Sequence, residues 1–119
     1  MEREDFLMKK TVVLFLAAGL LVTGFWGAGT GKCADERGKT IFDGKCAMCH
    51  GTDGSGNGPA AAALNPGPAD FNTASFWGKM SDARITEVIE NGHGSMPAFT
   101  LSSGEIRAVI NYMKEAFKP

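Results

Sequence analysis

Residues 46–50 read Cys-Ala-Met-Cys-His, and this short stretch decides the fold. Two cysteines separated by two residues and followed at once by a histidine have the spacing used for covalent haem attachment. Thiols about one helical turn apart can add to the two vinyl groups on one edge of a porphyrin. The adjacent histidine can then bind the iron through a ring nitrogen. We therefore predict thioether links from Cys46 and Cys49 to haem c, and a proximal iron ligand at His50.

Two other uses of a Cys-x-x-Cys pair fit the sequence less well. A thioredoxin-like redox pair needs a preceding strand in a βαβ context, which the residues before Cys46 do not indicate. A structural zinc site needs a second pair of ligands, for which only His93 and Cys33 remain. Covalent attachment also suits a small chain, because it retains the cofactor without full enclosure. One covalently bound haem, with its iron, is the predicted cofactor.

Helical patterns lie on both sides of the motif, with long loops between them. Residues 34–45 predict a short helix, and residues 51–71 predict a long loop rich in Gly and Pro with one helical turn in its four alanines. Apolar residues at helical spacing predict a helix that starts near Ser81 and ends at Gly92. After a second loop, a capping-box spacing at Ser102 opens a last helix. No alternating run long enough for a paired sheet is present, so the predicted fold class is all-α.

The chain is small and close to neutral. It has 119 residues, with 12 basic and 13 acidic side chains and a formal net charge of −1. No basic surplus exists for holding nucleic acid, so a nucleic-acid partner is not expected. The apolar content of 44% is that of an ordinary globular chain and excludes a wholly disordered one.

The N-terminal third has the features of a targeting segment. An unbroken apolar run at residues 12–22 directly follows Lys9 and Lys10. A positive region followed by an apolar region of this length is typical of a secretory signal peptide. The run is short for a bilayer span of roughly 20 residues. Small residues follow it, and we expect cleavage within residues 31–34.

The predicted organisation is a signal peptide over residues 1–33 and a cytochrome c domain over residues 34–119. An acidic prefix precedes Met8, which is followed by two lysines, so Met8 is a candidate for the true start. Two alternatives stay open for the segment. Instead of being cleaved within residues 31–34, it could be retained as a membrane anchor, or Cys33 could be a lipidation site.

The mature part of the chain resembles the class I c-type cytochromes, monohaem electron-transfer proteins of the bacterial periplasm. CAMCHG at residues 46–51 is similar to their attachment motif. Gly38 and Phe42 match the Gly-x-x-x-aromatic pattern of their first helix, and Tyr112 matches the aromatic residue of their last helix. In that family these helices cross, and the glycine allows close backbone approach. The resemblance implies a small cytochrome c fold, with three to five helices and long loops wrapped round one covalently bound haem.

The resemblance also implies a distal iron ligand from the loop GHGSMPAF, which makes Met96 the candidate. The other methionines fit this role less well. Met48 lies inside the attachment turn and cannot reach the opposite face of the ring. Met80 precedes a helix, and Met113 falls on an apolar helical stripe that is typical of core residues. His93, three residues before Met96, is the alternative and would give bis-His ligation.

Further cofactor contacts follow from the same resemblance. The carbonyl of Pro66 or Pro68 is expected to accept a hydrogen bond from His50, unless both prolines only stiffen the loop. The indole N–H of Trp77 is expected either to bond a haem propionate or to belong to the packed core. The apolar walls of the pocket are expected from six residues: Leu64, Phe71, Phe76, Ile85, Ile89 and Phe99.

The predicted function is one-electron transfer in an oxidising compartment outside the cytoplasm, and not enzymatic catalysis. A thioether ligand favours Fe(II) and raises the potential relative to two nitrogen ligands. The expected partners are redox proteins, either donor and acceptor cytochromes or a reductase or dehydrogenase, with a membrane only if the signal segment is retained. The alternative is a haem c subunit or domain of a periplasmic dehydrogenase or reductase complex. A two-haem peroxidase would need a second CxxCH motif, whereas the sequence contains only the one at residues 46–50.

Overall fold

A continuous helical run carries the chain into the attachment motif. The computed structural model describes residues 31–119, with side chains from residue 36 onward. The run consists of α2 (Gly31–Ile41), the π-helical turn η1 (Phe42–Cys46) and the short helix α3 (Ala47–His50). Within η1 the N–H of Ala47 donates to the carbonyl of Phe42, five residues earlier. The extra residue of a π-turn shifts the facing of the following side chains, and such turns recur at functional sites.

The N-terminal predictions mostly concern residues that the structure does not describe. Residues 1–30, which hold most of the predicted signal peptide, lie outside the described part of the chain. The predicted cleavage region at residues 31–34 falls in the first turn of α2. Within residues 31–119, no helix has the length and apolar character needed to cross a membrane. The division into residues 1–33 and 34–119 stays a prediction.

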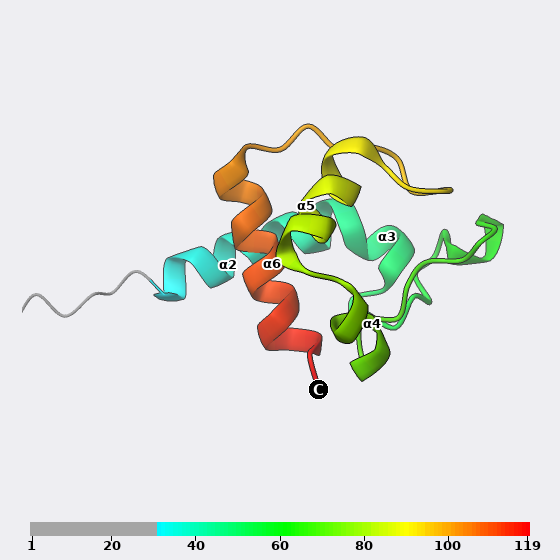
Figure 1. Cartoon of the computed structure of the whole chain (residues 1–119), viewed down its shortest axis with the longest axis horizontal. Helices are drawn as coiled ribbons and strands as arrows, with labels where there is room; N and C mark the ends of the chain where they lie inside the picture. Colours follow the sequence, from blue (N-terminus) through cyan, green and yellow to red (C-terminus); the bar gives the residue numbers. More distant parts are fainter. Residues whose placement is uncertain (1–30) are drawn as a thin grey trace, which may run out of the picture.

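The first and last helices cross at a glycine. The last helix, α6 (Ser103–Phe117), starts at the predicted Ser102, whose capping box with Glu105 is complete. Helices α2 and α6 pack against each other, as Figure 1 shows. A Cβ on Gly38 would lie 2.1 Å from the carbonyl oxygen of Ala108, which is far inside van der Waals contact. The expectation that a glycine permits close backbone approach is therefore confirmed.

Two of the loop and helix predictions between these ends are also confirmed. Three of the four alanines of the long loop form a 3-10 turn, η2 (Ala61–Ala63). Helix α5 (Asp82–Asn91) begins after Ser81, whose side chain accepts from the Arg84 N–H, and ends at Gly92 with a positive φ of 76°. Among the residues that the structure describes, the only β-type pairing is an isolated bridge between residues 93 and 96. The all-α class is confirmed.

One helix has no counterpart in the sequence predictions. Helix α4 (Ala74–Lys79) starts after Thr73, whose side chain accepts from the N–H of Phe76. With six residues it makes less than two turns, which is too short for an apolar repeat to identify it. It follows the long loop and leads through Met80 to α5, so it closes one side of the space between α3 and α5 (Figure 1).

The core is centred on the ring of Phe42. This side chain is fully buried, and three aromatic rings surround it. Their centroids lie 5.1–6.3 Å from that of Phe42 and belong to Phe117, Tyr112 and Phe71. Tilted and edge-on contacts of this kind add about 0.5–1.5 kcal/mol per pair beyond burial. Phe42 is the aromatic residue of the Gly-x-x-x-aromatic pattern that begins at Gly38. The same short pattern therefore positions both the helix crossing and the core.

We expect Gly38→Ala to destabilise the holoprotein by about 2 kcal/mol or more, because the added methyl meets backbone atoms that cannot move aside. Thermal unfolding followed by circular dichroism measures this loss. Gly104→Ala is the matched control, since a Cβ there meets nothing within 4 Å. Its melting temperature should stay the same or rise slightly. Equal melting temperatures for the two variants would contradict the packing argument.

Candidate haem-binding site

The attachment helix α3 is held by the loop that follows it. The last four carbonyls of a helix have no partner within that helix. In α3, all four accept hydrogen bonds from backbone N–H groups of residues 51–60. These bonds are 2.8–3.0 Å long and run from Gly51 to Ala47, from Ala60 to Met48, from Gly58 to Cys49 and from Gly56 to His50. A Cβ on Gly58 would lie 2.4 Å from the Met48 carbonyl oxygen, so only glycine allows the loop to come this close.

Both cysteine thiols line a cavity beside α3. Cys46 and Cys49 are free and half-buried. Burial raises the pKa of the Cys46 thiol to about 11, so this thiol is neutral at pH 7. A redox-active or metal-binding cysteine instead has a lowered pKa. In the described part of the chain, no group of three His, Cys, Asp or Glu side chains is arranged to hold a metal ion. The Cys46 thiol therefore has the character of a neutral attachment point.

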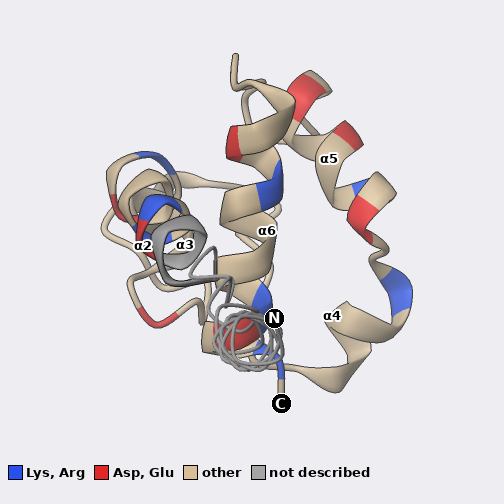
Figure 2. Ribbon diagram, turned by 90° about the vertical axis from the view of Figure 1, so that its left-hand side faces the viewer, with Lys and Arg blue, Asp and Glu red and all other residues tan. Residues whose placement is uncertain are grey.

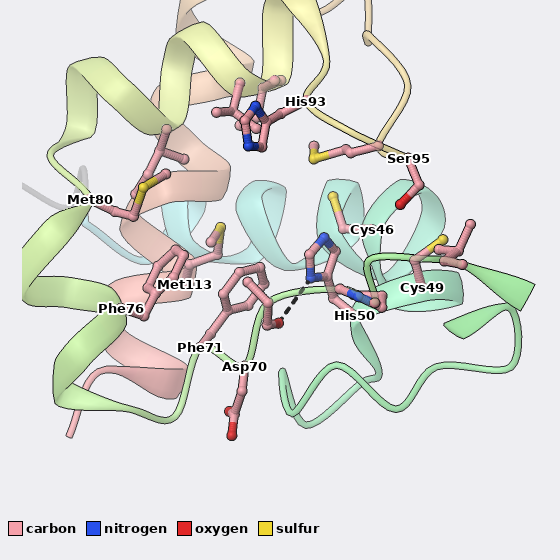
Figure 3. A pocket seen from close by; sticks show the side chains of 18 of the residues that line it. Cys46, Cys49, His50, Asp70, Phe71, Phe76, Met80, His93, Ser95 and Met113 are labelled. Atoms are coloured by element: carbon pink, nitrogen blue, oxygen red, sulfur yellow. Dashed lines mark hydrogen bonds between the residues drawn. The ribbon is translucent and has the colours of Figure 1, made fainter. Parts of the chain in front are cut away.

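The His50 ring is held from two sides. Its Nδ1 lies 3.3 Å from the carbonyl oxygen of Ala69 (dashed line in Figure 3), and since a carbonyl only accepts, the ring donates. The ring of Phe71 stacks on it at a centroid distance of 4.5 Å. Burial lowers the pKa of His50, against the opposing effect of the Ala69 hydrogen bond, so the ring is neutral at pH 7. Nε2 then keeps a free lone pair for a metal. The hydrogen bond from Nδ1 to Ala69 fixes the orientation of the ring.

The expectation of a proline carbonyl partner for His50 is wrong by one residue. The acceptor is Ala69, directly after Pro68. The Pro66 carbonyl instead accepts from the hydroxyl of Ser95 at 2.9 Å. The Pro66 carbonyl therefore ties two loops together, and the backbone just beyond the prolines orients the ring. Nothing in the sequence distinguishes these neighbouring carbonyls, because every residue in this stretch carries one.

The opposite wall of the cavity is a tight turn after α5. Two backbone hydrogen bonds of 3.0 Å join His93 and Met96 in both directions. The turn needs two glycines with positive φ, 76° at Gly92 and 58° at Gly94. The N–H of Phe99 donates to Ile89 at 2.8 Å, which anchors the end of the loop on α5. The predicted ligand loop is thus rigidly attached at both ends.

Both candidate distal ligands line the same cavity. Figure 3 shows His93 and His50 on opposite sides of it, with Cys46 between them at one edge. Met96 is half-buried and packs against the core, whereas His93 is exposed. Met80 and Met113 also line the cavity, while Met48 is 61% exposed and does not.

The cavity has a volume of about 550 Å³ and walls that are largely apolar. Pockets for organic ligands and cofactors usually measure roughly 300–1,000 Å³. The six apolar wall residues expected from sequence, from Leu64 to Phe99, all line it. Trp77 does not, and its indole N–H donates to the Phe71 carbonyl at 2.7 Å. Of the two roles considered for Trp77, the structure therefore supports packing against the core.

The residues present fit a covalently attached haem. A largely apolar cavity suits a porphyrin ring, two free thiols lie at one edge, and a neutral imidazole with an oriented Nε2 lies beside them. A family model described as cytochrome c oxidase, cbb3-type, subunit III matches residues 34–113. This chain belongs to that family. As a cbb3-type cytochrome c domain with one CxxCH motif, it has haem c as its cofactor.

Two similar proteins extend this assignment. The cbb3-type cytochrome c oxidase subunit CcoP of Azospirillum brasilense is 31% identical over 87 residues, which cover 71% of this chain and 29% of CcoP. The cbb3-type domain described here thus spans under a third of that relative. A chain of the Kuenenia stuttgartiensis reducing HAO-like protein complex Kustc0457/Kustc0458 has the same fold, with a TM-score of 0.59 and 24% identity. The match covers 70% of this chain and 42% of the other.

We expect the chain matured in the presence of haem-attachment machinery to carry one haem that acid–acetone does not extract, because two thioether links hold it. Cys46→Ser and Cys49→Ser should each reduce the yield of covalent haem sharply. The pyridine haemochrome spectrum measures the number of links. Met48 lies between the two cysteines and has an exposed side chain. Met48→Ser is therefore the control, and its yield of covalent haem should be unchanged. Quantitative extraction of haem from the unaltered chain would contradict the assignment of the thiols.

Proposed function

We propose that this cbb3-type cytochrome c domain is a one-electron carrier whose haem is attached through Cys46 and Cys49 and ligated by His50 and Met96. The observation that carries the proposal is that all four side chains line one cavity, with His50 and the Met96 loop on facing walls. When bound, the haem supplies reversible Fe(II)/Fe(III) chemistry. His50 and Met96 would hold the iron, so that the protein itself would fill the positions at which a substrate could otherwise bind.

His50 serves as the proximal ligand because its free ring nitrogen is chemically and sterically prepared. Donation of the Nδ1 proton to Ala69 fixes the tautomer in which Nε2 is unprotonated. Stacking on Phe71 and the hydrogen bond together restrict rotation of the ring. A ligand that is already oriented loses little conformational freedom on binding the metal, and it keeps its geometry when the metal changes its charge.

Met96 is favoured over His93 by burial and by chemistry. Met96 packs against the core, so its neutral thioether sits in an environment that it prefers. His93 is exposed, and an imidazole gains from contact with water. Sulfur also stabilises Fe(II), which suits a carrier of comparatively high potential. Gly92 and Gly94 in the turn bring the backbone of the loop close to the cavity without filling it.

Docking of a redox partner on this domain is expected to depend little on a patch of charges of one sign. Figure 2 shows Lys, Arg, Asp and Glu interspersed along α5 and α6 in that view. Several of these charges pair with each other, as Arg84 does with Glu87 at 2.7 Å and Lys114 with Asp82 at 2.6 Å. Paired and mixed charges steer partners weakly. At this surface α3 exposes the apolar side chain of Met48, and the loop over residues 51–60 adds one charged side chain, that of Asp53.

The domain is proposed to work outside the cytoplasm. The apolar run at residues 12–22 supports export, after which the segment is either cleaved or kept as an anchor. The second candidate function is that of a haem c subunit within a larger oxidoreductase, and the resemblance to CcoP, an oxidase subunit by name, favours it. The expected partners are redox proteins in both cases.

We expect Met96→Ala to abolish the weak far-red sulfur-to-iron band of the ferric protein, to lower the midpoint potential and to open the iron to added cyanide. The covalent haem should stay attached, because its thioethers do not involve Met96. His93→Ala is the matched variant from the same turn and should leave the band and the potential nearly unchanged. Absorption spectra and a redox titration measure these effects. If His93→Ala opens the iron and Met96→Ala does not, the ligation is bis-His and the high potential is wrong.

We expect the tagged chain, isolated from its native cells, to run as a single polypeptide in the soluble periplasmic fraction if it is a free carrier. Gel filtration of that fraction, with haem absorbance as the readout, measures the size of the haem-bearing species. Stoichiometric co-purification with other oxidoreductase subunits would support the second candidate function. Recovery only from the membrane fraction would show that the N-terminal segment is retained.

A further inference from the structure

Two lysines with different surroundings line the haem cavity, Lys45 and Lys79. Lys45 directly precedes Cys46, so it belongs to the edge that carries the thiols. Lys79 is the last residue of α4 and belongs to another wall. Within residues 31–119, Lys79 has no carboxylate as an ion-pair partner, since the four ion pairs there use other cations. Lys79 is exposed at the rim of this largely apolar cavity, and its ammonium is available to an anionic group of a ligand bound there.

Helix α4 lies across the cavity from the attachment edge. Figure 3 shows Phe76 and Met80, which flank Lys79 in sequence, on the side away from Cys46 and Cys49. In haem c the vinyl-derived carbons bind the cysteines, and the two propionate carboxylates project from the far side of the ring. A haem fixed at Cys46 and Cys49 therefore directs its carboxylates toward α4.

The polar side chains of α4 leave two groups available for a carboxylate. The hydroxyl of Thr73, the residue before α4, already donates to the backbone carbonyl of Asp70 and accepts from the backbone N–H of Phe76. Ser75 lines the cavity, and no hydrogen bond engages its hydroxyl within the described residues. The indole N–H of Trp77 is used by the Phe71 carbonyl. The remaining groups are the hydroxyl of Ser75 and the ammonium of Lys79.

The other charged or titratable groups around the cavity do not compete for this role. Figure 3 shows the Asp70 carboxylate pointing away from the cavity, where it accepts the N–H of Asn72 at 2.8 Å. His93 and His50 lie on opposite sides of the cavity (Figure 3), and Lys45 directly precedes Cys46 in the sequence. Lys79 is therefore the cation at the α4 end of the described lining.

We propose that Lys79, assisted by the hydroxyl of Ser75, binds a haem propionate and holds that carboxylate in its charged form. The proposal rests on attachment through Cys46 and Cys49, because that attachment sets which end of the ring faces α4. Lys79 is a positioning and tuning residue, since it acts on the iron through the propionate. A paired propionate adds less uncompensated negative charge near the iron, so Fe(III) is stabilised less and the midpoint potential is higher.

The test compares Lys79→Gln with Lys45→Gln in the holoprotein. Both changes remove one positive charge from a lysine that lines the same cavity, so general electrostatics alters both variants alike. The pH dependence of the midpoint potential, and of the haem-methyl NMR shifts of the ferric protein, reports the pKa of the propionate. We expect Lys79→Gln to raise this pKa by roughly half a unit, about a threefold change in proton affinity, which is the scale of an exposed ion pair. The midpoint potential at neutral pH should fall.

Lys45→Gln should leave the pKa of the propionate in place, Ser75→Ala should raise it by less than Lys79→Gln, and Lys79→Arg should restore it. An equal shift in the two glutamine variants, or no shift in Lys79→Gln, overturns the proposal. The far-red band and resistance to acid–acetone extraction are checked first. Loss of either in the unaltered protein contradicts the proposed ligation or attachment, whereas a fixed propionate pKa in an intact holoprotein contradicts the role of Lys79 alone.

Discussion

Four backbone carbonyls at the end of α3 need partners, and the way they obtain them organises the rest of the domain. Helix α3 continues the run of α2 and η1, and the loop over residues 51–60 completes it by donating to all four of its carbonyls. The π-turn before it sets the facing of the cysteines. Together these two features fix Cys46, Cys49 and His50 as a unit before any side-chain packing is considered.

The domain combines a packed core with a cavity. The packed core is the crossing of α2 and α6 at Gly38, around Phe42. The cavity, of about 550 Å³, lies between α3, α4 and α5. A ligand that fills an apolar space of this size supplies van der Waals contacts to the residues that line it. The haem therefore completes the core as well as supplying the redox chemistry, and a chain this small has little other apolar surface to bury.

The parts of the fold that follow from local rules were predictable, and the parts that follow from long-range backbone contacts were not. Helix α6 has a capping box and a clear apolar period, and Gly38 belongs to a short pattern that requires close approach. Helix α4 is too short to show a period. The acceptor for His50 was wrong by one residue, because the path of the loop, set by distant contacts such as that of Ser95 with Pro66, decides which carbonyl meets the ring.

The six apolar walls were identified correctly for a different reason. Each is a large apolar residue, and residues of this type are most often directed inward in a compact domain. The role of Trp77 illustrates the limit of that reasoning. Sequence shows that an indole N–H needs a partner, but the choice between a cofactor and the neighbouring Phe71 carbonyl depends on a local turn that composition does not reveal.

The loop over residues 51–60 holds α3 through its backbone N–H groups, and the Asp53 carboxylate stabilises the loop itself by accepting from Ser55. The outward side chains of Pro59, Ala62 and Ala63 are exposed, and they take no part in the hydrogen bonds that fix the attachment helix. Their identity is thus uncoupled from the geometry of the cofactor. Substitutions at these exposed positions therefore leave the backbone hydrogen bonds of the attachment helix intact, so the surface above the site can change while the geometry beneath it stays fixed.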